Sequence, residues 1–101
     1  MKNITTIPAA WTEISDLFVA LGDAHRQRIL LSFEHHERLT ILQIVAGSQL
    51  SRTAVTHHLH VLEKGGALHR EKVGREVYFW VDREWMRQTL LNVARFIEEE
   101  F

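Results

Sequence analysis

Two helix-start signals lie close together in the middle of the chain, and they constrain the fold more than any other feature. Thr40 and Gln43 form a capping box, in which each side chain bonds the backbone N–H of the other residue. Ser51 is a cap residue for the helix that follows. Only the short turn Ser48-Gln49-Leu50 separates the two helices. This pattern predicts a helix-turn-helix over residues 40–64.

Helices are predicted on both sides of this unit. Apolar residues recur at helical spacing over 11–21, 24–36 and 83–98, and Asp23 is placed to cap the second of these segments. Pro8 closes a tail, residues 1–8, that we expect to be mobile.

A β-hairpin is predicted between the helix-turn-helix and the last helix. The runs 67–73 and 76–81 are short, and Gly74-Arg75 separates them. The expected order is therefore helix, helix, helix, helix, hairpin, helix. This is a mainly α fold with one small β-hairpin, a winged helix-turn-helix with the wing at 67–81, and 101 residues suit a single domain.

The second helix of the helix-turn-helix has two chemically different faces. Val55, Leu59 and Leu62 recur at the spacing of an inward stripe. The opposite stripe holds only hydrogen-bonding or cationic side chains, which can address the donors, acceptors and methyl groups of a DNA major groove. With the cap residue and the first helical residue, the predicted DNA-reading set on this helix is Ser51, Arg52, Thr53, Thr56, His57, His60 and Lys64.

The hairpin adds positive charge beside that helix. Residues 50–81 carry five basic and three acidic side chains, a balance of +2, whereas the whole chain has a net charge of −1. Arg70, Lys72 and Arg75 lie around the glycine turn and are predicted to contact the DNA backbone.

Several other classes of protein do not fit the sequence. There is no cysteine, no nucleophile–histidine–carboxylate set and no glycine-rich phosphate loop, so no catalytic residue and no cofactor are predicted, and the protein is not expected to be an enzyme. No stretch is apolar enough for a signal peptide or a membrane span, so we expect a cytoplasmic protein that joins the bacterial nucleoid when bound to DNA.

Three segments resemble the ArsR family of bacterial repressors. Residues 50–62 are similar to the recognition helix of that family, and residues 21–30 are similar to the opening of its second helix. Gly66, Gly74 and Tyr78 fall where the wing pattern of the family expects them. The resemblance covers about residues 11–81.

The resemblance implies a homodimeric repressor on a pseudo-palindromic double-stranded DNA operator. In the family the first and last helices form the dimer interface. The apolar stripes over 11–21 and 83–98 suit that role, and the residues expected in the interface are Trp11, Ile14, Leu17, Phe18, Leu90, Val93 and Ile97.

The chain departs from the family where metal-sensing members bind metal. Residues 39–45, the stretch that carries the cysteine motif in those members, hold no ligand, and residues 83–101 contain neither Asp nor His. No metal site is therefore predicted, and the effector is left open. The alternatives are a winged-helix module that binds another protein, or a regulator in which histidines such as His57 and His60 respond to metal or pH.

Overall fold

A computed structural model describes all residues, 1–101. The elements are α1 (Ala9–Leu21), α2 (Ala24–Leu31), β1 (Leu39–Thr40), α3 (Ile41–Ala46), α4 (Arg52–Lys64), β2 (Leu68–Val73), β3 (Glu76–Val81) and α5 (Arg83–Glu100). The predicted mainly helical architecture with a small antiparallel β element is confirmed, although the sheet has three strands rather than two.

The third strand, β1, was not predicted. It has only two residues, and it pairs with the far strand of the hairpin through Leu39 opposite Phe79 and Thr40 opposite Tyr78. The strand order is therefore β1-β3-β2. A strand of two residues is too short to show an alternating sequence pattern. It is recognised only from its pairing with β3, which lies far along the chain.

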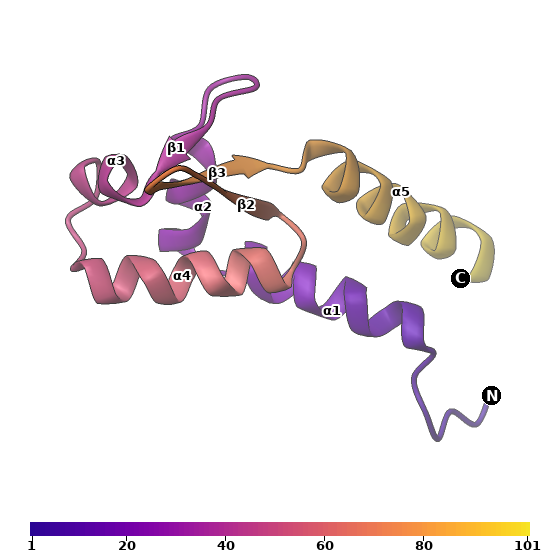
Figure 1. The fold of residues 1–101 in the computed structure, drawn as a ribbon. Coiled ribbons are helices and arrows are strands. Elements are labelled where there is room, and N and C mark those ends of the chain that lie inside the picture. Colours follow the sequence, from indigo (N-terminus) through magenta and orange to yellow (C-terminus); the bar gives the residue numbers. More distant parts are fainter.

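The second helix is shorter than predicted. The sequence pattern favoured residues 24–36, but α2 ends at Leu31 and the chain continues as an irregular loop to Arg38. His36 adopts a left-handed backbone conformation with φ of 60° in this loop. The early end of α2 leaves enough chain to turn back and place β1 against β3 (Figure 1).

One hydrophobic core joins the elements. Phe79 from the sheet is buried with residues of all four preceding helices; the core consists of Leu17, Ala20, Ile29, Ile44, Val55, Leu59, Leu62, Ala67, Leu68 and Phe79. Helices α1 and α4 approach each other closely beside Gly65. A Cβ atom on residue 65 would lie 2.7 Å from the Cβ of Ala20.

The molecule is elongated, with extents of 53 × 24 × 22 Å. Figure 1 shows why: α1 and α5 extend to the same side of the body, where both termini lie. Trp11 and Phe96 connect these two helices through an edge-to-face contact with ring centroids 5.2 Å apart. The helix-turn-helix and the hairpin make up the other end.

Candidate nucleic-acid interface

The turn between α3 and α4 is held by the two caps that the sequence predicts. The Gln43 backbone N–H donates to Thr40 Oγ1 at 3.3 Å, and the Thr40 N–H donates to Gln43 Oε1 at 2.8 Å. Ser51 Oγ accepts from the Ala54 N–H at 3.1 Å. The hydroxyl oxygen of Ser51 is thus engaged in fixing the start of α4, which sets the angle at which this helix leaves the body.

The α4 helix separates its two faces as expected. Val55, Leu59 and Leu62 are fully buried against the core. The opposite face is open to solvent: Arg52, Thr53, His57, His60 and Lys64 are exposed and Thr56 is half-buried. Neither Arg52 nor Lys64 forms an ion pair. The structure therefore brings these predicted residues together on one accessible surface, which we call the α4 polar face.

Arg70 is placed differently from the other predicted wing cations. Its guanidinium makes a two-point contact with Glu63 of α4, with Nε to Oε2 at 2.8 Å and Nη2 to Oε1 at 2.5 Å. It also lies 4.8 Å over the Phe79 ring. The hydrogen bond with Glu63 raises the pKa of Arg70 further above its ordinary value. Arg70 thus ties the base of the hairpin to α4 and has less freedom than the sequence suggested to contact another molecule.

The tip of the hairpin carries two uncommitted cations. Lys72 and Arg75 are exposed and form no side-chain hydrogen bond or ion pair, and they flank Gly74, whose φ of 63° makes the tight turn possible. Of the neighbouring carboxylates, Glu71 is paired with Arg38 at 3.1 Å. Glu76, the residue after Arg75, is then the one unpaired carboxylate beside these two cations. The positive charge at the tip is therefore available to an anionic partner.

Arg26, which no local sequence pattern singles out, connects three helices. From α2, its Nε donates to the Ala20 carbonyl at 3.1 Å and its Nη2 donates to the Val19 carbonyl at 2.9 Å, so it caps the end of α1. Its Nη1 lies 3.2 Å from Nδ1 of His58 on α4. The partners are too far apart in the sequence for any local pattern to indicate this arrangement.

His58 is therefore held in its neutral form. Burial lowers the pKa of His58, the neighbouring basic groups Arg26, His25 and His57 lower it further, and Asp23 opposes them. With Arg26 donating to Nδ1, the remaining proton belongs on Nε2.

A pH-dependent stability follows from this lowered pKa. Unfolding returns His58 to its ordinary pKa of about 6.5. As the pH falls below that value, the unfolded chain therefore binds more protons than the folded protein does. We expect the urea concentration at the unfolding midpoint to decrease as the pH is lowered from about 6.5 to the lower pKa of His58 in the folded protein. The variant His58→Asn keeps an acceptor for Arg26 and cannot titrate, so its midpoint should depend less on pH.

The matched control for this experiment is His60→Asn, which removes an imidazole that is 64% exposed on the same helix. This variant should keep the pH dependence of the unmodified protein. An unchanged dependence in His58→Asn would contradict the assignment of a neutral, bonded His58.

The other histidines do not assemble into a ligand set. His60 Nδ1 lies 3.9 Å from Glu63 Oε1, and His57 lies beside His58 with ring centroids 5.7 Å apart. Nowhere do three or more His, Asp or Glu side chains come together in a way that could hold a metal ion.

The predicted dimer residues divide into three groups by exposure. Leu17 was wrongly placed in an interface: it is 0% exposed and belongs to the protomer's own core, so it cannot contact a second chain. Trp11, Ile14 and Val93 are half-buried. Phe18, Leu90 and Ile97 are exposed, at 46%, 41% and 53%, and so are their neighbours Val19 and Leu91.

No helix of the structure combines the length and the apolar character that crossing a membrane requires.

Comparison with known proteins agrees with this geometry. No protein-family model matches the sequence. A transcriptional repressor SmtB homolog from Synechocystis sp. is 26% identical over 87 residues, which make up 86% of this chain and 65% of that protein. The cadmium resistance transcriptional regulatory protein CadC from Listeria innocua is 29% identical over 68 residues, 67% of this chain and 57% of the relative. The chain thus spans less than two thirds of the length of these curated relatives.

A solved structure shows the same fold. An ArsR-like transcriptional regulator from Rhodococcus sp. superimposes with a TM-score of 0.79 and 26% identity, covering 88% of this chain and 83% of that one. These relatives are named as regulators of transcription and not as enzymes, in agreement with the prediction from the sequence.

Proposed function

We propose that this chain, a winged helix-turn-helix protein of the ArsR family, is a sequence-specific DNA-binding repressor that acts as a homodimer. The observation that carries the proposal is the pairing of the α4 polar face with the uncommitted cations of the hairpin tip. Hydrogen-bonding groups for base edges and cations for phosphates are the two components that DNA readout needs.

The proposed roles follow from which side chains are free. Thr53, Thr56, His57 and His60 contact base edges in the major groove, with Arg52 and Lys64 at the two ends of the same face. Lys72 and Arg75 follow the flanking phosphates. Ser51 and Arg70 support this surface indirectly, because one caps α4 and the other joins the hairpin to it.

Dimerisation is proposed from the apolar surface that the protomer leaves exposed. Phe18 on α1 and Leu90 and Ile97 on α5 belong to the two helices that extend from the body, and we propose that they meet the same helices of a second copy. Trp11, Ile14 and Val93 are expected at the edge of that contact. A two-fold dimer would place two copies of α4 in successive major grooves, on the order of 10 bp apart.

The test is a fluorescence-anisotropy titration of the protein with DNA from upstream of its own gene and with a scrambled duplex, each at two salt concentrations. We expect tighter binding to the upstream DNA, weakening as salt rises. Equal and weak binding to both duplexes would contradict the proposal and favour a winged-helix module that binds another protein.

Two variants in the same titration separate the proposed roles. Arg75→Ala should weaken binding to both duplexes and reduce the salt slope by about 1, because one phosphate contact is lost. His57→Ala should instead reduce the preference for the upstream DNA, by roughly 5- to 150-fold, the range of about 1–3 kcal/mol for one base contact.

The control is Arg95→Ala, which removes the same charge from an exposed residue of α5. It should leave both the salt slope and the sequence preference unchanged. If Arg75→Ala altered the preference and left the salt slope unchanged, the assignment of roles would be wrong.

A further inference from the structure

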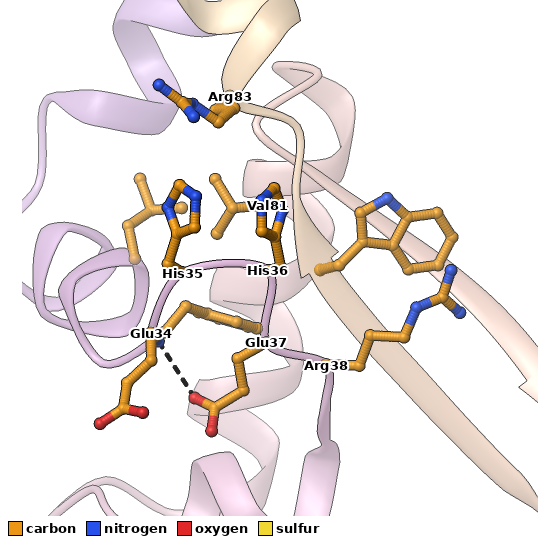
Figure 2. Close-up of a pocket in the computed structure, with 10 residues that line it drawn as sticks. Glu34, His35, His36, Glu37, Arg38, Val81 and Arg83 are labelled. Carbon is orange, nitrogen blue, oxygen red and sulfur yellow. Dashed lines mark hydrogen bonds between the residues drawn. The ribbon is translucent and has the colours of Figure 1, made fainter.

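A second concave site lies away from the α4 polar face. A cavity of about 580 Å³ is bounded by the loop after α2, the end of β3 and the first residue of α5. Figure 2 shows the residues that line it. In Figure 1 this loop projects from the top of the molecule, whereas α4 runs along the bottom. The volume is within the range of small-molecule sites.

The base of the cavity is apolar. Leu30 and Phe33 contribute from α2 and the residues just after it, and Trp80 and Val81 contribute from β3. Phe33 and Val81 also pack against the hydrophobic core, so this part of the wall is anchored. Such a base favours a ligand with an apolar body.

The carboxylates around the cavity are occupied or turned away. Glu37 Oε1 accepts from the Glu34 backbone N–H at 3.1 Å, which folds the carboxylate onto the loop. The Glu34 side chain points away from the histidine rings in Figure 2. Arg38 is also committed, since it pairs with Glu71 at 3.1 Å and its guanidinium carbon lies 4.1 Å from the Trp80 ring centroid.

The cation that remains uncommitted is Arg83. It lines the cavity, and it forms no ion pair and donates no side-chain hydrogen bond. Figure 2 shows it across the cavity from His35 and His36, whose rings lie side by side with centroids 3.9 Å apart. The left-handed backbone at His36, which is unfavourable for a residue with a Cβ, helps to place both rings there.

We propose that this cavity binds a small aromatic monocarboxylate, with the carboxylate on Arg83 and the histidine rings and the aromatic body against Leu30, Phe33 and Val81. A guanidinium binds a carboxylate through two parallel hydrogen bonds. The apolar base distinguishes such a ligand from inorganic phosphate, which has no apolar part to bury.

A ligand bound in this cavity would lie next to both the hairpin and α5. Asp82, the residue before Arg83, accepts from His69 Nε2 of β2 at 2.7 Å and caps α5 by accepting from the Trp85 N–H at 2.9 Å. A carboxylate held by Arg83 therefore lies beside the junction between the wing and the proposed dimer helix. Resting on the proposed function, we infer that the ligand changes the affinity of the protein for its operator.

The experiment is a titration of the ¹⁵N-labelled full chain with benzoate, followed by two-dimensional NMR. We expect saturable shift changes in residues 33–38 and 80–83. Benzamide, a neutral molecule of the same shape, and inorganic phosphate should each bind at least ten times more weakly than benzoate. Arg83→Gln should bind benzoate at least ten times more weakly than the unmodified protein. Outside the cavity, its amide spectrum should remain that of the folded protein.

The matched control is Arg87→Gln, one turn further along α5, which removes the same charge from a residue paired with Glu84 at 3.5 Å. It should bind benzoate as the unmodified protein does. Equal binding of benzamide, equal losses in Arg83→Gln and Arg87→Gln, or shift changes centred on another part of the molecule would each overturn the site.

The link to DNA is tested separately, by repeating the anisotropy titration with saturating benzoate. We expect at least a threefold change in the dissociation constant for the upstream DNA, and no change in Arg83→Gln. Benzoate binding without any change in DNA affinity would overturn the regulatory role and leave the site intact. Because the NMR titration contains no DNA, a failure of the proposed DNA-binding function would not affect its result.

Discussion

Replacing Gly66 by alanine is expected to destabilise the protein by roughly 2–5 kcal/mol, combining left-handed strain with overpacking. Gly66 has a φ of 77°, and a Cβ atom built on it would lie 2.1 Å from Trp85 Nε1. The indole cannot move aside freely, because Nε1 donates to the Gly65 carbonyl at 3.1 Å. The change would thus separate the start of α5 from the end of α4. Urea unfolding, monitored by circular dichroism, measures the effect.

Gly74→Ala is the matched control for this prediction. Gly74 has a similar φ of 63°, but a Cβ atom there would have no heavy atom within 4 Å. It should therefore show the backbone strain alone, about 1 kcal/mol. If the two variants were equally destabilised, close packing of Trp85 against Gly66 would not be the cause.

Replacing Ile97 by glutamate is expected to abolish dimerisation and to weaken operator binding by at least about 100-fold, since each protomer would then bind one half-site alone. Ile97 is 53% exposed on α5, so the folding of a single protomer should tolerate the change. A charge buried without a partner in the proposed interface would be strongly unfavourable. Sedimentation equilibrium gives the association state, and anisotropy gives the DNA affinity.

The control for this substitution is Leu31→Glu, which introduces the same charge at a residue that is 84% exposed on α2. Leu31 lies outside the two proposed dimer helices, so this variant should remain dimeric and bind DNA normally. A dimeric Ile97→Glu protein, or loss of dimerisation in both variants, would contradict the proposed interface.

Elements whose causes are local could be predicted from the residue pattern alone. The capping box at Thr40 and the cap at Ser51 act within a single helical turn, so their residues could be identified from spacing alone. The division of α4 into buried and exposed faces depends only on the 3.6-residue period, and Val55, Leu59 and Leu62 are buried as that period predicts. The residues proposed to face DNA on α4 could be identified from the same helical period.

The partner that each residue contacts depends instead on the packing of the whole chain. An apolar stripe shows that a face is buried, but not against what, and so Leu17 was assigned to a second chain although it fills the protomer's own core. The sequence pattern predicts Arg70 to be a free cation of the wing, but in the folded protein it is hydrogen-bonded to Glu63. The early end of α2, the strand β1 and the contact of Arg26 with His58 all depend on residues more than a helical turn away, whose proximity is set by packing of the whole chain and not by local preference.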